Sequence, residues 1–310
     1  MIDAPRPVPA VPAGGVLRVV APCGVVRPDA VADGLRHLRD AGFCVQLADH
    51  VYGCDSSAPY LAGTDRERAA DLTAAFLDDD VHGVICARGG FGAMRTLELL
   101  GCDAWPAKPL LGFSDVTALH GWLLAQQGMM SLHGPLLSTL AAHEPEALAG
   151  AVGALRGLAP APLAMQTVCP GVADGPLVGG NLSLLSSLAG TRWFPSLRGA
   201  VVFIEEIGEA AYRIDRMITS LMWRGLREAA AVVFGDLGST GDRYVAGADL
   251  DASIRDRVCQ LMAPLGIPVA WGAGFGHRTH NATLHVGARA SLRADANGAV
   301  LRMACAVEAR

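Results

Sequence analysis

The stretch KPLLGFSDVTALHGWLLAQQ, residues 108–127, joins an apolar strand pattern to a helical pattern through a single serine. Three earlier apolar runs, VLRVVAP, CVQLAD and VHGVICA, are likewise followed by helical patterns. Strands that alternate with helices over short connections pair in parallel, with helices on both faces of the sheet. The first half therefore predicts a Rossmann-like, mostly parallel α/β sheet, whose ligand site lies at the C-terminal ends of the strands.

The character of the chain changes after about Glu144, where the sequence becomes rich in Ala, Gly and Pro. Beyond this point strand patterns surround the helical pattern AAYRIDRMITSLMWRGL, which indicates a β-rich α+β domain. Near the end, ATLHVG and ASLRAD have the alternation of a β-hairpin. We expect a loose lead-in over residues 1–15, an α/β domain over 16–150, a linker over 151–175 and a C-terminal domain over 176–310.

The composition indicates a packed protein, and several classes of partner are not expected. The 310 residues are 51% hydrophobic and 18% charged, the net charge is −5, and Lys108 is the only lysine. No basic run indicates nucleic-acid binding, and no apolar stretch reaches the roughly 18 residues of a membrane span. The N-terminus lacks a signal-peptide pattern, so we expect a cytoplasmic protein. The eight cysteines form no C-x-x-C pair, which favours free thiols over a zinc site.

Ser114 stands where the strand pattern ends and the helical pattern begins. A sharp junction of this kind exposes a nucleophile above the sheet edge and directs free helix N–H groups at developing negative charge. GFSDV keeps only the first glycine of the G-x-S-x-G motif, so an ordinary helix N-cap is the competing interpretation. Asp115 and His120 do not complete a local triad, because five helical residues turn the chain by roughly 140°. We interpret His120 as a packing residue.

Candidates for the base and the acid lie in other segments. His277 follows the glycine-rich GAGFG, and such loops can carry a side chain into a cleft. His280 is the second choice there, and His133 in SLHGP is a competitor. Glu205 and Glu206 end the strand pattern GAVVFIEE, and only one can face the cleft because adjacent strand residues point to opposite sides. A carboxylate there would hold an imidazole in the required tautomer.

These segments, taken in order, resemble the LD-carboxypeptidase family of serine peptidases. The resemblance runs from about residue 16 to residue 290. It implies an α/β nucleophile domain, a C-terminal domain that carries the acid and the base, and an active site in the cleft between them. It places the nucleophile at Ser114, the acid at Glu205 and the base at His277. The segments are YLAGTDRERAADL, ICARGGFGAMRTL, LLGFSDVTALH, HGP, GGNLSLL, VVFIEEIGEAAYRIDRM and GFGHRTHNATLHVG.

The resemblance also implies a reaction. It implies hydrolysis of the L,D amide bond that releases terminal D-alanine from cytoplasmic murein tetrapeptide, in peptidoglycan recycling, with no cofactor and no metal. The backbone N–H groups of Gly90 and Asp115 would form the oxyanion hole. Arg88, Gly89 and Arg278 are candidates for substrate binding, because arginine can bind a carboxylate through two hydrogen bonds. A structural ion pair is the alternative for each arginine. The family is often dimeric, so the resemblance allows a homodimer.

The sequence departs from the family pattern at four positions near these residues. Cys23 follows AP where serine is usual, and Glu206 stands where aspartate is usual. Arg278 replaces the glycine that usually follows the histidine, and His285 replaces the proline of an LP pair. None of these changes removes a member of the triad. The changes at Arg278 and His285 bear on substrate preference.

Other functions stay open. The microcin-immunity branch of the same family cleaves a peptidyl–adenylate-type amide and would need an aromatic platform, for which Trp193, Trp223 and Trp271 are candidates. A binding protein of this fold without turnover is the alternative from another class. A nucleotide-dependent enzyme is not expected, because no G-x-x-x-x-G-K-[ST] occurs and RGGFGAMR lacks the G-x-G-x-x-G spacing.

Overall fold

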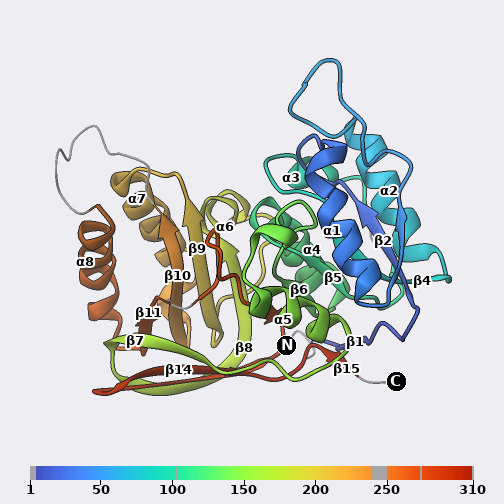
Figure 1. Cartoon of the computed structure of the whole chain (residues 1–310). Coiled ribbons are helices and arrows are strands. Elements are labelled where there is room, and N and C mark those ends of the chain that lie inside the picture. Colours follow the sequence, from blue (N-terminus) through green and yellow to red (C-terminus); the bar gives the residue numbers. More distant parts are fainter. Residues whose placement is uncertain (1–4, 102, 239–249, 273, 309–310) are drawn as a thin grey trace.

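The sheet of the N-terminal domain contains β12 (Leu284–Val286), β6 (Ser131–His133), β5 (Leu110–Gly112), β4 (Val81–Cys86), β2 (Val16–Val20) and β3 (Cys44–Leu47), in that spatial order. The computed structural model describes residues 5–101, 103–238, 250–272 and 274–308, and Figure 1 shows this sheet beside a second, barrel-shaped domain. The strands from the first half of the chain pair in parallel, whereas β12 runs antiparallel to β6. The predicted, mostly parallel sheet is therefore confirmed.

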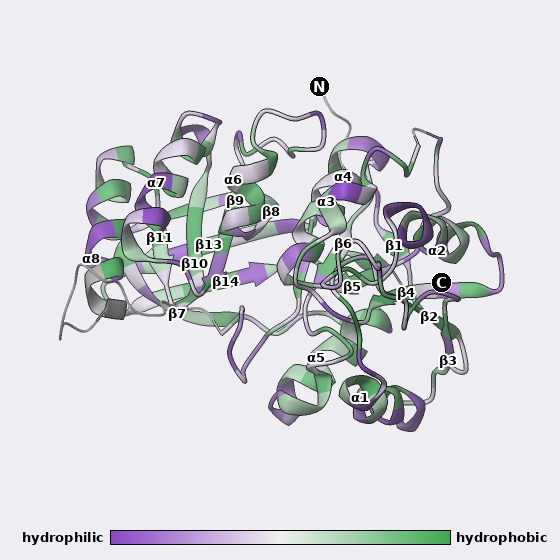
Figure 2. Ribbon diagram, turned by 90° about the horizontal axis from the view of Figure 1, so that it is seen from above, coloured by the Kyte–Doolittle hydropathy of each residue, from purple (hydrophilic) through white to green (hydrophobic). Residues whose placement is uncertain are grey.

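Helices cover both faces of this sheet. Figure 2 shows α1 (Pro28–Asp40) and α5 (Pro145–Leu155) on one side, and α2 (Asp65–Leu77), α3 (Ala93–Thr96) and α4 (Thr117–Gln127) on the other. The start of α2 is a capping box, in which the side chain of Thr64 accepts from the N–H of Glu67 and the side chain of Glu67 accepts from the N–H of Thr64. The α3 helix, which follows the apolar run VHGVICA, spans only four residues.

The C-terminal domain is a closed barrel flanked by helices, and this confirms the predicted β-rich domain. In one of its strands the apolar run Val201–Ile204 is fully buried, as is usual for an unbroken apolar run. The barrel order is β10 (Ala231–Gly238), β11 (Val269–Trp271), β7 (Leu163–Cys169), β14 (Gly298–Met303), β13 (Arg289–Asp295), β8 (Gly171–Asn181) and β9 (Val201–Ile207). The helices are α6 (Leu182–Leu188), α7 (Ala211–Met222) and α8 (Leu250–Met262).

The predicted hairpin of ATLHVG and ASLRAD is wrong. Instead of pairing with each other, β12 pairs with β6 at the edge of the N-terminal sheet, while β13 pairs with β8 and β14 in the barrel. The chain turns at Gly287, whose φ of +85° favours glycine. Of the two strands only β13 is alternately buried and exposed, whereas all three residues of β12 are buried, and neither pattern reveals the partner strand. The hairpin of this region is β13–β14.

Two segments expected to be loose carry regular structure. In the predicted lead-in, β1 (Val8–Pro9) pairs in parallel with β15 (Val307–Glu308). Residues 1–4 of the lead-in lie outside the described residues. The predicted linker over residues 151–175 includes the end of α5, all of β7 and the beginning of β8. The chain therefore crosses between the domains within the ordered barrel.

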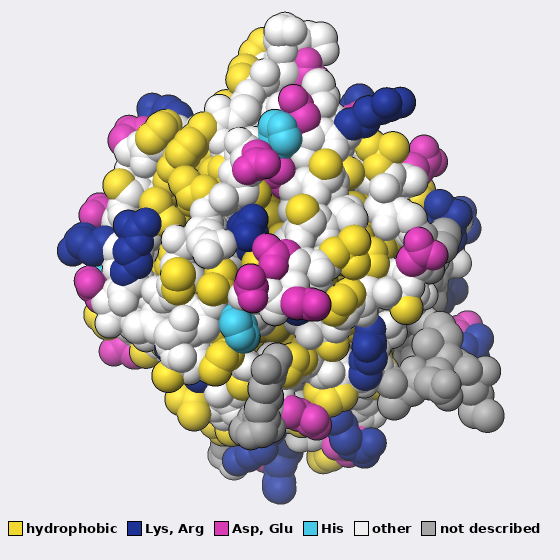
Figure 3. Space-filling model, turned by 90° about the vertical axis from the view of Figure 1, so that its right-hand side faces the viewer, with side chains coloured by type: hydrophobic (Ala, Val, Ile, Leu, Met, Phe, Trp, Pro, Cys, Tyr) yellow, Lys and Arg dark blue, Asp and Glu magenta, His cyan; other side chains and the backbone are white. Residues whose placement is uncertain are grey.

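The remaining global features concern thiols, helix length and surface charge. All described cysteines are free, and Cys102 lies outside the described residues. No described helix is both long and apolar enough to cross a membrane. Figure 3 shows the face formed by the N-terminal domain, where acidic and basic side chains are interspersed with apolar ones.

Candidate active site

Ser114 lies at a sharp turn between a strand and a helix. The strand β5 ends at Gly112, the 3₁₀ turn η1 (Ser114–Val116) begins two residues later, and α4 follows directly. The N-cap of this turn is Phe113, so Ser114 is not an ordinary N-cap. Its φ is +64°, and among the described residues it is the only one other than glycine with a positive φ. This conformation costs about 1–2 kcal/mol for a residue with a side chain, and such strain is common where a side chain is held for chemistry.

The imidazole of His277 reaches Ser114 from the C-terminal half of the chain. Its Nε2 lies 3.2 Å from Oγ of Ser114, and its Nδ1 lies 2.7 Å from Oε2 of Glu205. The ring of Phe113 packs against the imidazole, with ring centroids 4.7 Å apart. The structure thus brings together the three residues that the sequence predicted. Their order is that of a nucleophile, a base and an acid that orients the base.

The two adjacent glutamates of β9 have different partners. Glu205 is fully buried and contacts the imidazole. Glu206 accepts hydrogen bonds from the N–H of Ser183 at 2.7 Å, the N–H of Ile207 at 2.9 Å and the amide of Asn181 at 3.0 Å. Because Asn181 is the N-cap of α6, Glu206 holds the start of that helix. The carboxylate that faces the base is therefore that of Glu205.

Burial and pairing together set the protonation of the site. Desolvation lowers the pKa of His277, but the hydrogen bond and the charge of Glu205 outweigh it, so the pKa lies above its ordinary value. Burial raises the pKa of Glu205, and the contact with His277 opposes that shift. A buried carboxylate of this kind stabilises the protonated imidazole that forms when the base takes a proton.

The glycine-rich loop between β4 and α3 packs against the serine. A side chain on Gly89 would place its Cβ 3.0 Å from Cβ and 3.1 Å from Oγ of Ser114, so only glycine fits there without a shift. Gly90 has a φ of +105°, which also favours glycine. Within the described residues, the N–H groups of Gly90 and Asp115 make no hydrogen bond. These free donors follow Gly89 and Ser114, the two residues that pack against each other, and an oxyanion hole requires free donors of this kind.

The competing histidines of the N-terminal domain are buried in the packing. His133 on β6 is fully buried, and neither ring nitrogen has a hydrogen-bond partner among the residues that the structure describes. Its ring packs against Phe203, with centroids 5.0 Å apart. His120 is also fully buried and contacts Oγ of Ser131 and the carbonyl of Gly112, both at 2.8 Å. The predicted packing role of His120 is therefore confirmed.

His280, the second choice for the base, lies at a junction between the domains. Its Nδ1 is 3.1 Å from the carboxylate of Glu144, which precedes α5. The N–H of Glu144 also donates to the carbonyl of Thr279 at 3.0 Å. These contacts tie the segment that follows His277 to the N-terminal domain. Within the described ranges, no group of three or more His, Cys, Asp or Glu residues could hold a metal ion.

The two candidate arginines come from different halves of the chain and have different partners. Arg88 is exposed, and its Nη1 donates to the carbonyl of Val25 at 2.7 Å. Arg278 pairs with Asp236 on β10, with Nε and Oδ1 2.8 Å apart. Together with Trp271, these two residues line a cavity of about 340 Å³. Both arginines are therefore anchored by contacts within the protein.

Three residues near the site have roles that the sequence analysis did not assign. Asn281 is buried, and its Oδ1 accepts the N–H of Gly276 at 3.1 Å, which orders the loop before the base. Asn181 caps α6 and supports Glu206. The carboxylate of Asp115 accepts the N–H of Ala93 at 2.8 Å. All three lie in the quoted motifs, but the motifs do not show which atom each side chain contacts.

Comparison with known protein families matches both halves of the chain. The LD-carboxypeptidase N-terminal domain matches residues 17–134, and the LD-carboxypeptidase C-terminal domain matches residues 174–292. A protein of Synechocystis sp. named as a carboxypeptidase is 38% identical, over 94% of this chain and 95% of its own. The murein tetrapeptide carboxypeptidase of Pseudomonas aeruginosa is 29% identical, over 87% of this chain and 90% of its own.

Solved structures have the same fold. The muramoyltetrapeptide carboxypeptidase of Oxalobacter formigenes superposes with a TM-score of 0.74 and 26% identity, over 93% of this chain and 98% of its own. The microcin C7 self-immunity protein MccF, in complex with aspartyl sulfamoyl adenosine, superposes with a TM-score of 0.85, over 98% of this chain and 100% of its own. Its identity is only 19%, so this second likeness concerns the fold alone.

Proposed function

The chain belongs to the LD-carboxypeptidase family and is a serine-type hydrolase, and from this premise we propose that it releases terminal D-alanine from murein tetrapeptide through a Ser114–His277–Glu205 acyl-enzyme mechanism. The observation that carries the mechanism is the pair of contacts made by His277, 3.2 Å to Ser114 and 2.7 Å to Glu205. The likeness to the murein tetrapeptide carboxypeptidase of Pseudomonas aeruginosa supports the substrate.

In the proposed first step, Oγ of Ser114 attacks the carbonyl carbon of the L,D amide while Nε2 of His277 takes the hydroxyl proton. The carbonyl oxygen becomes an oxyanion that the N–H groups of Gly90 and Asp115 stabilise. As the C–N bond breaks, protonated His277 gives its proton to the amine of D-alanine. Throughout this step Glu205 holds Nδ1–H and stabilises the imidazolium.

In the second step, water replaces D-alanine next to the base. His277 takes a proton from the water, whose oxygen attacks the ester carbon of the acyl-enzyme. The ester bond to Oγ then breaks, and Ser114 recovers its proton from the imidazolium. The products are a tripeptide, free D-alanine and the unchanged enzyme.

The experiment that tests this proposal follows D-alanine release from murein tetrapeptide by purified protein. We expect the native protein to release D-alanine and Ser114→Ala to lose nearly all of that activity. A fluorophosphonate probe should label the native protein at Ser114, which also tests the alternative of a binding protein without turnover. If Ser114→Ala still releases D-alanine, the nucleophile is assigned wrongly.

We propose that Arg88 and Arg278 bind the substrate, with Gly89 giving it room beside Ser114. Arg88 precedes the proposed oxyanion loop, and Arg278 lines the cavity beside Asp236. Arg88→Met and Arg278→Met should raise KM for the tetrapeptide more than they lower kcat, because an arginine that binds the substrate equally in the ground state and the transition state affects KM. A structural role would instead lower the melting temperature without a selective effect on KM.

A second candidate is hydrolysis of a peptidyl–adenylate-type amide, as in the microcin-immunity branch. The fold that this chain shares with MccF is compatible with that reaction, and the observation that bears on it is the exposure of the candidate aromatic platforms. Of the candidate aromatic platforms, Trp223 is 72% exposed, whereas Trp193 and Trp271 are half-buried. Assaying murein tetrapeptide and an aminoacyl sulfamoyl adenosine side by side separates the two functions, because turnover of only one identifies the substrate class.

Cytoplasmic location, a role in peptidoglycan recycling and a homodimer are further parts of the proposal, supported by the family resemblance. Light scattering coupled to gel filtration measures the oligomeric state. Cell fractionation with antibody detection locates the protein. A strain that lacks the protein should accumulate murein tetrapeptide in its cytoplasm if the recycling role is correct.

A further inference from the structure

The two donors of the proposed oxyanion hole belong to two separate segments of the chain. One donor, the N–H of Asp115, belongs to the turn that carries Ser114. The other, the N–H of Gly90, belongs to a loop in which Gly89, Gly90 and Gly92 occur within four residues. A glycine-rich loop has more backbone freedom than any other, so its position must come from contacts with its surroundings. Those contacts determine whether both donors can reach one oxyanion.

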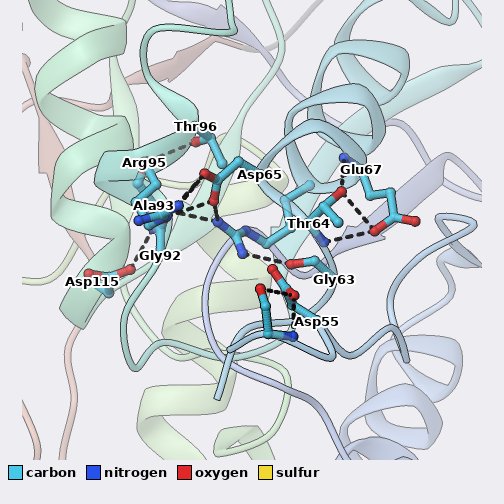
Figure 4. Close-up of polar contacts among 12 residues, drawn as sticks. Asp55, Gly63, Thr64, Asp65, Glu67, Gly92, Ala93, Arg95, Thr96 and Asp115 are labelled. Carbon is cyan, nitrogen blue, oxygen red and sulfur yellow. Dashed lines mark hydrogen bonds and ion pairs between the residues drawn. The ribbon is translucent and has the colours of Figure 1, made fainter. Parts of the chain in front are cut away.

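One end of the loop is held by the residue that follows the nucleophile. The Oδ2 atom of Asp115 accepts the N–H of Ala93 at 2.8 Å, at the start of α3, and Figure 4 shows this contact. The N-cap residue of α3 is Gly92, which has no side chain to cap the helix, so the carboxylate of Asp115 takes that place. Asp115 is only 1% exposed, so water does not compete for the contact.

A buried cation supports the same end of the loop. Arg68 is 1% exposed, and its guanidinium donates to the carbonyls of Gly63 at 2.9 Å and Gly92 at 3.5 Å. Asp65 pairs with Arg68 and also binds Arg95 of α3 through both carboxylate oxygens, as Figure 4 shows for Asp65 and Arg95. Burial raises the pKa of Asp115, whereas the bond from Ala93 and the charge of Arg68 lower it. Because burial is the larger effect, the pKa of Asp115 lies above its ordinary value, and the hydrogen bond from Ala93 is among the few contacts that offset the desolvation of this carboxyl group.

The other end of the loop is tied to the segment that contains Cys23. The N–H of Gly24 donates to the carbonyl of Gly89 at 3.0 Å. The Cys23 thiol is fully buried, and after burial itself the charge of Asp115 is the largest cause of its raised pKa. Asp115 therefore lies where three segments meet: the nucleophile turn, the start of α3 and the residues that follow β2.

We propose that the carboxylate of Asp115 is a positioning residue that holds the glycine loop so that the N–H groups of Gly90 and Asp115 converge on one oxyanion. The residue then has two functions, one in its backbone and one in its side chain. Its side chain touches neither the substrate nor the reacting atoms. It acts through Ala93 and the loop before it.

This inference rests on the proposed function, and it is tested with purified full-length protein and murein tetrapeptide. Asp115→Ala should lower kcat on the order of 10²-fold, near the loss caused by removing one oxyanion donor. KM should change by no more than about twofold, because a loop that fails only in the transition state lowers kcat alone. Asp115→Asn keeps an oxygen acceptor for Ala93 and should recover most of the activity. If the alanine variant does not fold, Asp115→Ser serves instead, because its hydroxyl is too short to replace the carboxylate.

A readout that a merely structural role would not change is the binding of a tetrahedral mimic. A boronic acid analogue of the murein peptide should bind Asp115→Ala more weakly, in proportion to the loss of kcat, while the product tripeptide binds as before. Thr96→Val is the matched control, because it removes the bond from Thr96 to the carbonyl of Ala93 within α3 and leaves Asp115 unchanged. Its kcat should stay within about twofold of the native value, since the variant alters no group that stabilises the transition state.

Two outcomes overturn the inference. The first is a kcat of Asp115→Ala or Asp115→Ser close to the native value, and the second is equal weakening of the boronate and the tripeptide. Measuring Ser114→Ala beside these variants distinguishes an error in the positioning role of Asp115 from an error in the proposed function. An inactive Ser114→Ala with a fully active Asp115→Ala refutes only the positioning role, whereas an active Ser114→Ala refutes the mechanism itself.

Discussion

The Nδ1 atom of His277 lies 2.7 Å from Oε2 of Glu205, although 72 residues separate them in the chain. The loop that carries the imidazole passes over the end of β9, where Gly276 leaves no room for a side chain: a Cβ there would lie 3.2 Å from Cβ of Glu205. An acceptor at Nδ1 assigns the hydrogen to that nitrogen and leaves Nε2 free to accept the proton of Ser114. The pair therefore prepares the base before any substrate binds.

Glu205→Gln should slow the reaction and move its pH dependence. The base must be neutral, so kcat/KM falls as the pH drops through the pKa of His277, which lies above 6.5 in the native protein. Without the charge of Glu205 that pKa falls, and the acid limb of kcat/KM moves to lower pH. We also expect kcat to fall on the order of 10⁴-fold, as when the acid of a triad becomes an amide. Rate profiles from pH 5 to 9 measure both effects, and an unmoved acid limb would contradict the assignment of Glu205.

Glu206→Ala is the matched variant for the neighbouring glutamate, and it should act on stability. The substitution leaves the buried side-chain amide of Asn181 without its acceptor and removes the acceptor of the half-buried N–H of Ser183. Leaving a buried donor unsatisfied costs about 1–3 kcal/mol. Urea unfolding should therefore show a lower free energy of unfolding, while the acid limb of kcat/KM moves less than in Glu205→Gln, because Glu206 contributes less than Glu205 to the raised pKa of His277. A shift of that limb equal to that in Glu205→Gln would mean that both glutamates act on the base.

Ser114→Gly and Ser114→Ala should both be inactive, but they should differ in stability. The φ of +64° is strained for alanine and unstrained for glycine. We expect the glycine variant to be more stable than the alanine variant by about 1 kcal/mol, because the strain it relieves exceeds the extra freedom it gives the unfolded chain. Melting temperatures of the two variants measure the difference. A more stable alanine variant would show that the turn relaxes once the hydroxyl is gone.

The free energy of unfolding should fall as the pH is lowered from 6.5 towards 4. Burial lowers the pKa of His120 to about 4, and it lowers the pKa of His285 to about 4 as well. Between these values and 6.5 the unfolded chain binds more protons than the folded one, so stability is present above pH 6.5 and is lost below it. Each histidine contributes on the order of 3 kcal/mol at the acid limit.

The measurement for this prediction is urea unfolding at a series of pH values. His285→Gln should reduce the slope of stability against pH, because it removes one of the groups that protonate on unfolding. His37→Gln is the control, because His37 is a half-buried residue of α1, far less enclosed than His285. An equal slope in all three proteins would show that His285 does not contribute.

Much of the site could be predicted from the sequence because its residues lie where one local pattern, such as a strand, gives way to another, such as a helix or a glycine-rich loop. The strand-to-helix turn at Ser114, the glycine loop before Gly90 and the loop that carries His277 are each visible as a change of pattern. The distinction between Glu205 and Glu206 is not, because it depends on where α6 begins. In the folded chain Asn181 and Ser183 donate hydrogen bonds to Glu206. Glu205, which points to the opposite face of β9, contacts the imidazole of His277 instead.

What could not be predicted depends on contacts across the sheet. Both strands form where the sequence predicted them, but their pairing follows from which open edge each one meets. The contact from Asp115 to Ala93 joins segments 22 residues apart and leaves no periodic mark in the sequence. Residue types and their order indicate the chemistry of the site, whereas strand pairing and hydrogen-bond partners are known only from the three-dimensional structure.

The placement of β12 also constrains the order in which the protein can mature. Its three residues, Leu284–Val286, complete the edge of a sheet whose other strands are all synthesised before residue 134. On the ribosome, the nucleophile domain must wait with an open edge at β6 until almost the whole barrel has been translated. Open edges invite pairing with other chains, so this interval is the most exposed stage in the life of the polypeptide. A nascent chain stopped before Leu284 would have neither a finished sheet nor a working hydrolase.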